Sequence, residues 1–531
     1  MAVELHQAGR LREAELCYRR ILEQDPENAD VFHLLGLIAH QTGQQDAAVS
    51  LIQKAIERKP RSPLFHMNLA NVYRYIQDFD QAMLSYLEAV RLKPDYIEAY
   101  DKILLLKPDF AEVYVHRGNA RLNRGMASEA IADFKQAVEY RPDSAAAWNN
   151  LGTALERTAG NPDDIIASYR RAIALKTDFF EAFNNLGVTF QYLNQYEEAI
   201  EHYRQAIRIQ PDFEEAHFNL SLVLLVTGRF SAGWEEYEWR IKKQDWQSLC
   251  PHEFSIPRWD GTPFPGKTLF VYDEQGLGDT LQFVRYLPMV RALGGKVVLE
   301  TAEPLLELLK SAEIADEIIS RPFSSDPNAC FDYHVPLLSL PGMFRTCPDT
   351  IPAKIPYLAA SPKKSAYWRN RIDPSRLAIG IVWSGKPSHR NDRNRSCPFS
   401  KFKALLAIPG IQVIGLQKGA AASQAAELPP DSGFENVGHR LGHFDDTAGL
   451  IESLDLVITV DTSVAHLAGA MGKPVWVLVP FAPDWRWLLD RSDTPWYPTM
   501  RLFRQPKAGD WDAVFRKVKK ELKKFLKERG R

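Results

Sequence analysis

Two short segments place small, polar and acidic residues where an apolar run gives way to a helical pattern. In the first, 273-DEQGLGD-279, the glycines allow a tight turn that brings the main chain close to a ligand. A helix predicted to start near Thr280 would direct unpaired N–H groups to the same place, which favours negative charge. Asp279, at this helix start, could accept a proton from an attacking hydroxyl, or it could simply cap the helix. Gly276 and Gly278 are candidate ligand contacts, and Asp279 is the candidate catalytic base.

The second segment, 460-VDTSVAHLAG-469, has the same form and contains more candidate ligand contacts. Asp461 ends an apolar run, and Thr462 and Ser463 open a helix rich in small residues. Hydroxyls combined with free N–H groups at a helix start suit a diphosphate. His466 follows one turn later, either as a ligand contact or as a packed core histidine.

Two further loops follow apolar runs and carry cations. The segment 383-WSGKPSHRNDRNRS-396 suits a phosphate-bearing ligand, although a solvated loop is the alternative. Its candidate donor-binding residues are Lys386, His389 and Asn391, with Arg390, Arg393 and Arg395 nearby. In 414-IGLQKG-419, Gln417 could pair with a base or ribose and Lys418 with phosphate.

The apolar runs that precede these segments alternate with helical patterns, which predicts parallel sheets with crossover helices. The predicted strands are 269–272, 296–300, 331–335, 377–383, 412–416, 455–460 and 474–479. We therefore expect two Rossmann-like domains facing a cleft, with ligands at the carboxyl ends of their strands. The expected boundaries are a linker at 246–268, an acceptor-side domain at 269–370, a nucleotide-sugar domain at 371–510 and a basic helix at 511–531.

Residues 1–245 carry an internal repeat instead. Proline positions 26 to 60, 60 to 94 and 108 to 142 are each separated by 34 residues, and small residues recur at fixed offsets. This period is typical of tetratricopeptide helix pairs, which form an all-α superhelix. The segment 95–108 is too short for a pair, so we expect one helix or a local break. The sequence begins inside a repeat's first helix, which leaves open whether further repeats precede it.

One polar position recurs on the predicted inner face of the repeats. An asparagine lies two residues before the small residue of several first helices, and its amide could grip a peptide main chain without reading its sequence. These candidate acceptor-peptide residues are Asn68, Asn150, Asn185 and Asn219. The alternative is that they are simply part of the repeat consensus.

Composition narrows the class of protein. The net charge of −2 gives no general attraction to nucleic acid or membrane. The 5 cysteines are scattered without a CxxC pair, which argues against a disulfide framework or a zinc site. No apolar run is long enough for a transmembrane segment, so we expect a soluble, cytoplasmic protein. No complete GxGxxG with a downstream acid is present, which disfavours a dehydrogenase.

In order along the chain, these motifs resemble GT-B glycosyltransferases of the heptosyltransferase-like kind. The most similar are bacterial tetratricopeptide proteins that glycosylate flagellin, with protein O-GlcNAc transferase more distant. The resemblance covers nearly the whole chain and rests on residues 274–286, 382–396, 416–419, 460–469 and 483–498.

The resemblance implies inverting, metal-independent transfer of a sugar from a UDP- or CMP-linked donor to a Ser or Thr hydroxyl of a protein. It assigns the base role to Asp279 and the diphosphate cradle to Asp461, Thr462, Ser463 and His466. Ser463 replaces a glycine of the family pattern, which puts the amide contacts in doubt. No cofactor is implied beyond the nucleotide-sugar co-substrate.

Two other classes of function stay open. The chain could be an inactive protein-binding scaffold, or it could transfer sugar to lipid-linked or lipopolysaccharide acceptors. The last segment, 514-VFRKVKKELKKFLKERGR-531, reads as a final helix packed by its apolar stripe. A contact of its basic face with acidic lipid or acidic protein is the alternative.

Overall fold

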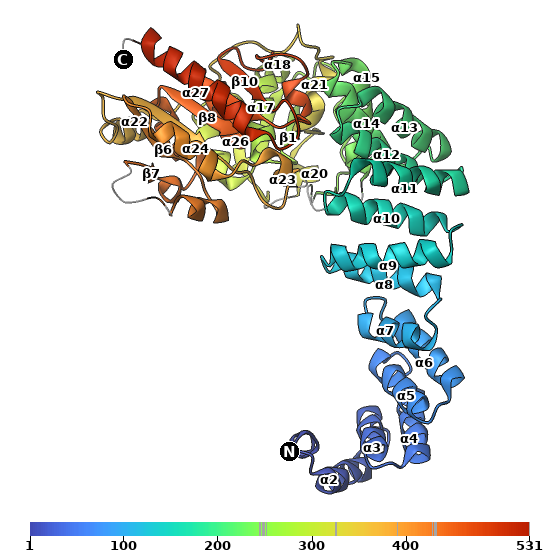
Figure 1. Ribbon diagram of the computed structural model, residues 1–531. Helices are drawn as coiled ribbons and strands as arrows, with labels where there is room; N and C mark the ends of the chain where they lie inside the picture. The colour runs from blue at the N-terminus through green and yellow to red at the C-terminus, as the bar shows by residue number, and fades with distance from the viewer. Residues whose placement is uncertain are drawn as a thin grey trace. The chain divides into compact units, whose positions relative to one another are not determined.

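The computed structural model describes residues 1–243, 246, 250, 252–323, 326–389, 391–426, 428 and 433–529. The chain divides into two compact units, Met1–Thr189 and Phe190–Arg531, and each is considered by itself. Figure 1 follows the chain through antiparallel helices into an α/β region. Within the described ranges, no helix is both long and apolar enough to cross a membrane.

The first unit is a stack of helix pairs. Its helices are α1 Ala2–Gln7, α2 Leu11–Gln24, α3 Ala29–Gln41, α4 Gln45–Arg58, α5 Pro63–Tyr75, α6 Phe79–Leu92, α7 Ile97–Leu106, α8 Ala111–Asn123, α9 Ala127–Tyr140, α10 Ala145–Arg157, α11 Pro162–Leu175 and most of α12 Phe180–Tyr192. Small residues let the two helices of a pair touch, as the repeat pattern predicts. A Cβ at Gly118 would stand 2.7 Å from the Phe134 ring, and one at Gly152 would stand 2.7 Å from the Tyr169 ring.

The shortened repeat forms a single helix. α7 packs against both α6 and α8, so the stack continues without a second partner. Arg117 of α8 joins α7 to α9, because it binds Asp101 at 2.6 Å and the buried Asp133 at 2.5 Å. Of the two outcomes expected for 95–108, the structure has the single helix.

The second unit begins with the end of the repeat pattern and continues into two parallel sheets. Its first helices are α13 Tyr196–Ile209, α14 Glu214–Val226, α15 Phe230–Tyr237 and the short η1 Glu238–Lys242. Leu225, Phe230 and Trp234 share one hydrophobic core with Leu269 and Val271 of the first strand. The compact-unit boundary therefore lies inside α12, ahead of residue 245.

The first sheet has the strand order β3-β2-β1-β4 and is entirely parallel. Its strands are β1 Thr268–Tyr272, β2 Lys296–Thr301, β3 Glu317–Ser320 and β4 Tyr333–Pro336. Helices and turns between and after them are α17 Leu277–Phe283, η2 Val284–Tyr286, α18 Leu287–Arg291, η3 Glu303–Leu305, α19 Leu306–Lys310, α20 Pro327–Cys330, η4 Leu337–Ser339 and α21 Leu340–Met343. Phe270 and Tyr272 face a separate cluster with Phe254, so the chain before β1 packs near one face of this sheet.

The second sheet has the order β10-β9-β8-β5-β6-β7, again parallel. Its strands are β5 Leu377–Val382, β6 Ile411–Gly415, β7 Glu435–Asn436, β8 Leu456–Val460, β9 Val475–Val479 and β10 Met500–Arg504. The other elements are α22 Pro362–Arg369, α23 Asp392–Arg395, α24 Phe399–Leu406, η5 Ala420–Ala425, η7 Gly438–Arg440, α25 Phe444–Glu452, α26 Ser463–Ala470, η8 Trp485–Trp487 and α27 Trp511–Glu528. This order is that of a doubly wound fold, whose switch point lies between β5 and β8.

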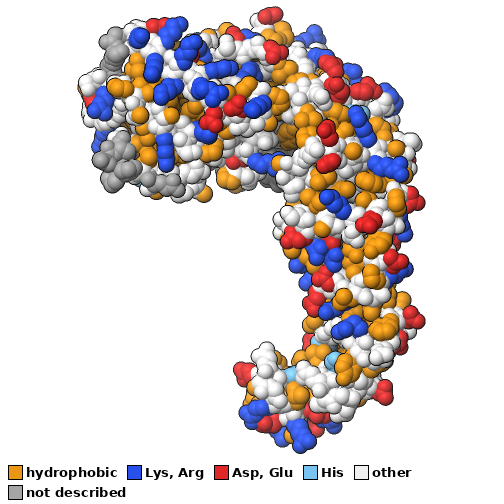
Figure 2. All heavy atoms as spheres, in the orientation of Figure 1, with side chains coloured by type: hydrophobic (Ala, Val, Ile, Leu, Met, Phe, Trp, Pro, Cys, Tyr) orange, Lys and Arg blue, Asp and Glu red, His pale blue; other side chains and the backbone are white. Residues whose placement is uncertain are grey.

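Side chains of the central strand alternate between two cores, as a sheet covered on both faces requires. Ile379 and Ile381 of β5 pack with α24 and α27, whereas Ala378 and Val382 pack in the core that includes α25 and α26. The final helix buries Val518, Leu522 and Leu526, so it packs by its apolar stripe as predicted. Figure 2 shows many Lys and Arg side chains on the face that contains this helix. The fold is thus an all-α repeat array followed by two α/β halves.

Candidate functional site

The segments 273–279 and 460–469 come into direct contact. α17 follows β1 and α26 follows β8, and the two helices pack against each other. A Cβ at Gly278 would stand 2.9 Å from His466 Cδ2 and 3.3 Å from Ser463 Cα. Only a glycine permits this approach without displacement. The starts of two helices, one from each α/β half, therefore meet at the carboxyl ends of their strands.

Asp279 lies beside this contact and is held from two sides. Its Oδ2 accepts a 2.8 Å hydrogen bond from the Gly276 amide, and its Oδ1 accepts one from Arg486 Nη2. The first bond is the capping arrangement considered as the alternative to a catalytic role. Each carboxylate oxygen keeps a second lone pair, so both functions are chemically compatible. Proton transfer to Oδ1 would nevertheless compete with the Arg486 bond.

Arg486 is a functional candidate that sequence reasoning missed. It donates from Nε to Gln282 Oε1 at 2.6 Å and from Nη1 to Asp484 Oδ1 at 2.9 Å, in addition to Asp279. The side chain is buried and its guanidinium lies 4.4 Å from the centre of the Trp485 ring. A signal was present in the sequence, because an arginine between two tryptophans in an apolar segment needs buried partners.

Asp461 directly follows β8, and its carboxyl interacts electrostatically with Arg486 and Asp484. Burial, reinforced by the negative charge of Asp484, raises the pKa of Asp461 to about 6, although Arg395 and Arg486 oppose the shift. Thr462 caps α26 and its hydroxyl lies 3.0 Å from that of Thr459. The site thus holds a carboxyl group that changes charge near neutral pH beside a helix start.

His466 is neutral in this environment. Burial, and then the positive charges of Arg486, Arg285 and Arg395, lower its pKa well below the ordinary value. Its Nδ1 lies 3.1 Å from the Tyr497 hydroxyl, and its ring stacks 5.5 Å from Trp487. These contacts are those of the packed histidine considered as the alternative, yet its Cδ2 edge faces Gly278.

The loop after β5 folds back on itself. The Ser396 hydroxyl accepts from the Gly385 amide at 3.0 Å and donates to Asp392 Oδ1 at 3.0 Å. Arg395 pairs with Asp392, and a Cβ at Gly385 would stand 2.5 Å from both side chains. Hydrogen bonds and an ion pair therefore join the two ends of this loop at the switch point.

The three residues of this loop that are candidates for binding the sugar donor differ in exposure and in hydrogen bonding. Lys386 and His389 are exposed. Asn391 is the N-cap residue of α23. Its main-chain N–H donates to His389 Nδ1, and its side-chain Oδ1 accepts from Asn394 Nδ2. Arg390, also singled out from the sequence, lies outside the described residues.

Gln417 and Lys418 have main-chain partners instead of open positions. Gln417 Oε1 accepts from the amides of Trp383 and Ser384, and its Nε2 donates to the carbonyls of Ser384 and Lys418. All four hydrogen-bonding positions of this buried amide are filled, so Gln417 positions the β5 loop and is not free to read a base. Lys418 donates to the carbonyls of Leu441 and Gly442.

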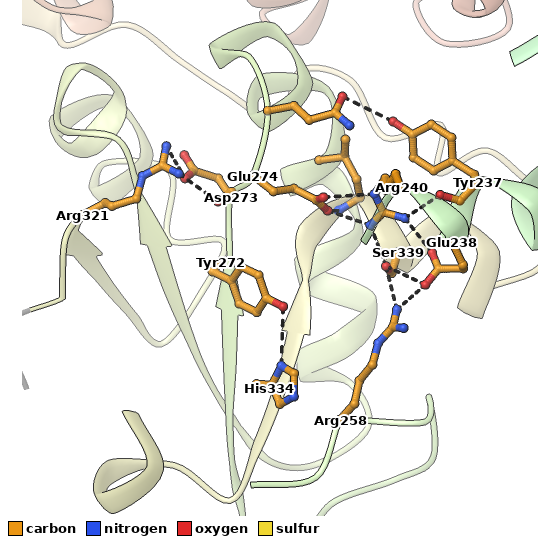
Figure 3. A network of polar contacts seen from close by, with 12 residues as sticks. Tyr237, Glu238, Arg240, Arg258, Tyr272, Asp273, Glu274, Arg321, His334 and Ser339 are labelled. Carbon is orange, nitrogen blue, oxygen red and sulfur yellow. Dashed lines mark hydrogen bonds and ion pairs between the residues drawn. The ribbon is translucent and has the colours of Figure 1, made fainter. Parts of the chain in front are cut away.

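A second set of charges holds Glu274, the residue just before the turn (Figure 3). Glu274, fully buried just before the glycines, receives two hydrogen bonds from Arg240 of η1, at 3.0 and 2.7 Å. Arg240 also binds Glu238, which Arg258 binds in turn. Burial raises the pKa of Glu274, with Arg240 opposing the shift. The end of the repeat pattern is therefore bonded to the residue that leads into the candidate site.

The candidate asparagines of the first unit connect successive helix pairs. Asn68 Nδ2 lies 2.8 Å from His33 Nε2, Asn150 donates to Asn119 at 3.0 Å, and Asn185 donates to Asn149 at 3.1 Å. Burial lowers the pKa of His33 to about 4, so it is the acceptor. Each bond uses one of the two N–H donors of an asparagine, which leaves the other for a peptide. Asn219 belongs to the second unit and is buried.

Within the described ranges, no group of three His, Cys, Asp or Glu side chains is arranged to hold a metal ion.

Comparison with known proteins identifies the first part of the chain. Models described as tetratricopeptide repeat match residues 1–63, 65–96, 115–178 and 180–213. These four segments are tetratricopeptide repeats. The gap between residues 96 and 115 contains α7, where the structure has a single helix.

Three relatives show how far similarity extends. Protein FlbA of Caulobacter vibrioides is 28% identical, covering 94% of this chain and 91% of that protein. The peroxisomal targeting signal receptor of Pichia angusta is 28% identical over 29% of this chain and 32% of its own length. Protein O-mannosyl-transferase TMTC1 of Mus musculus is 27% identical over 27% of this chain and 14% of its own length. The chain therefore spans less than a third of the last two relatives.

Proposed function

We propose that the protein is a metal-independent, inverting glycosyltransferase that moves a sugar from a nucleotide-sugar to a Ser or Thr hydroxyl of a protein. The observation that carries the proposal is the contact of α17 with α26 at Gly278, beside Asp279. It joins a candidate base from one α/β half to a helix start suited to phosphate from the other. The tetratricopeptide repeats supply a protein-binding surface for the acceptor.

The chemistry requires few groups. The acceptor hydroxyl oxygen attacks the anomeric carbon on the face opposite the phosphate, while the bond from that carbon to the phosphate oxygen breaks. Asp279 takes the hydroxyl proton, and the configuration at the anomeric carbon inverts. The leaving phosphate gains negative charge, which the start of α26 and the cations Lys386 and Arg486 would stabilise. A donor linked to UDP or CMP fits this scheme equally.

The relatives add support of a coarser kind. One relative is named a protein O-mannosyl-transferase and another a peroxisomal targeting signal receptor, and each is similar to less than a third of this chain. The acceptor peptide would lie along Asn68, Asn150 and Asn185, with flagellin as the acceptor that the sequence resemblance suggests. Transfer would take place in the cytoplasm.

Nucleotide binding is the first test of this function. Thermal unfolding of the full chain is measured with UDP, CMP, GDP and ADP added separately. A ligand at 100 times its dissociation constant raises the free energy of unfolding by about 2.7 kcal/mol. A shift with one nucleotide names the donor class, and no shift with any nucleotide or matching nucleotide-sugar contradicts a transferase.

Transfer itself is tested with Asp279→Asn, which keeps one of the two hydrogen-bond acceptors but not the base. We expect at least a hundredfold loss of sugar transfer with nucleotide binding retained. Asp493→Asn is the matched control, since Asp493 also pairs with an arginine but is exposed.

A specific observation favours a second candidate function. Both oxygens of Asp279 are already hydrogen-bonded, as expected if the site is inactive and the chain serves as a protein-binding scaffold. The test follows a labelled sugar on the nucleotide-sugar donor. Label that stays on the donor in the presence of acceptor protein supports the scaffold. Label that appears in lipid rather than protein identifies a transferase for lipid-linked acceptors.

A further inference from the structure

Arg486 connects the two α/β halves through three separate hydrogen bonds. Nε and Nη1 bind Gln282 and Asp484, while Nη2 alone binds Asp279. The guanidinium is a planar fork whose N–H groups point in fixed directions. Two of its edges can therefore hold the side chain in place while the third changes partner.

More carboxylates than unpaired cations surround Arg486. It binds both Asp279 and Asp484, and Asp461 lies within the influence of the same groups. Arg395 is already paired with Asp392, and Lys418 donates to two carbonyls. A phosphate arriving at the start of α26 needs a cation from the protein, and Arg486 binds the residue directly after Gly278, which contacts that helix start.

We propose that Arg486 exchanges Asp279 for the donor phosphate, so that donor binding itself frees the base. This inference rests on the proposed function. Before the donor binds, Nη2 donates to Asp279 Oδ1, and proton transfer from an acceptor hydroxyl to that oxygen competes with this bond. When the donor binds, Nη2 donates to a phosphate oxygen and the Oδ1 lone pair becomes available. Gln282 and Asp484 keep Nε and Nη1 in position throughout.

The exchange imposes an order on the reaction. Asp279 accepts the acceptor proton only after the sugar donor is seated, and Arg486 neutralises the phosphate as the glycosidic bond breaks. Arg486 is then a phosphate ligand and, through Asp279, a positioning residue. A purely structural arginine would hold the two halves together without distinguishing a nucleotide from its nucleoside.

That distinction is the test. Binding of the nucleotide that stabilises the wild-type chain is compared with binding of the matching nucleoside (uridine, cytidine, guanosine or adenosine) by calorimetry. In Arg486→Met, we expect nucleotide affinity to fall about tenfold or more with nucleoside affinity unchanged. Arg486→Lys should restore part of the nucleotide affinity, because it keeps the charge, but not kcat, because it lacks the fork. Arg491→Met is the matched control, since Arg491 forms an exposed pair with Asp493.

Each outcome has one meaning. If no nucleotide binds the wild-type chain, the proposed function fails and the inference with it. If the wild type binds and Arg486→Met retains the wild-type ratio of nucleotide to nucleoside affinity, the exchange is wrong while the function stands. If Arg486→Met does not fold, the same ratio is measured in Asp279→Asn/Arg486→Met, which removes one of the two carboxylates that lose their partner. A structure with bound nucleotide should place Nη2 on phosphate, and Nη2 still on Asp279 would overturn the proposal.

Discussion

At the scale of single residues, position 278 has the tightest steric requirement of the candidate site. Gly278→Ala would place a Cβ 2.9 Å from His466 Cδ2 and 3.3 Å from Ser463 Cα. We expect it to lower the free energy of unfolding by about 1–3 kcal/mol, measured by chemical denaturation. In Gly278→Ala/His466→Ala, part of this loss should return, because the closest contact is gone. Strictly additive effects would mean that the two helices do not touch here.

Asp461 gives the candidate site a dependence on pH. Its pKa of about 6 means that the carboxyl takes up a proton as the pH falls through 6, which removes a negative charge beside the phosphate position. Because this folded-state pKa is raised, the associated gain in stability is present in acid and lost as the pH rises through 6. Nucleotide affinity should rise by this effect on the order of tenfold, or about 1.4 kcal/mol, between pH 7.5 and 5.5.

Calorimetry at several pH values checks this against Asp461→Asn, which lacks the titrating group. The nucleotide's own phosphate titrates identically with both proteins, so only the difference between them counts. Parallel pH profiles would show that Asp461 has no part in ligand binding.

Residue identities were predictable from the sequence where type and turn geometry sufficed. The contact of Gly278 with Ser463 agrees with the local patterns of strand, turn and helix start, whereas the roles of Gly276, Asp279 and Ser463 stay predictions. Gln417 shows the limit of such prediction. The local pattern suggested that its side-chain amide was free to bind a ligand, but in the fold its oxygen accepts hydrogen bonds from the loop after β5. Arg486 was missed because its partners Asp279 and Gln282 lie about 200 residues earlier in the chain.

At the scale of elements, the short η1 determines how the turn before Asp279 is held. Arg240→Met leaves Glu274 buried without its cation, which should cost about 3–5 kcal/mol of unfolding free energy at pH 7. The pKa of Glu274 is already raised by burial, and loss of Arg240 raises it further. The deficit should therefore shrink as the pH falls from 7 to below the ordinary pKa of 4.5, where the carboxyl becomes neutral in both folded and unfolded chains.

Denaturation of Arg240→Met and Arg240→Met/Glu274→Gln across this pH range is the measurement. The double variant carries no unpaired charge and should regain most of the stability at pH 7. A deficit in Arg240→Met that stays constant with pH would show that Glu274 is not its source.

Strands were easier to predict than helices of the α/β halves. The fully buried runs at 269–272, 377–383 and 455–460 fall on β1, β5 and β8. β7 is only two residues long, and β3 and β10 lack a long apolar run, so their pattern is too weak to detect alone. Strand order was not predictable in detail, because it depends on crossovers between segments far apart in the sequence.

At the scale of the whole molecule, the compact-unit boundary predicts which fragments fold. Leu225, Phe230 and Trp234 are buried in the core of the first sheet. A fragment of residues 178–531 should therefore unfold cooperatively, whereas 246–531 should lose about 1.5–3 kcal/mol for each exposed core side chain and aggregate. Circular dichroism and gel filtration distinguish the two. Equal unfolding midpoints would show that the last repeats are dispensable to the sheets.

The repeat periodicity places the end of the array at residue 245, whereas the compact units divide inside α12. The pattern of 34 residues continues past α12. Each repeat needs the same small and aromatic residues between its two helices, whichever element packs against it next. The sequence shows where the repeat motif ends. It does not show which hydrophobic core the last repeat joins, because that depends on the element that packs against its final helix.

The position of that boundary has a consequence for how such a chain could be recombined. Helices α1 to α11 could be exchanged for those of another array, at a junction before α12, without removing any side chain from the core of the first sheet. An exchange at residue 245 would instead discard Trp234 and Arg240, and with them the anchorage of Glu274. Partner choice would thus be portable between proteins of this architecture, provided that every hybrid inherits α13 to η1 together with its own sheets.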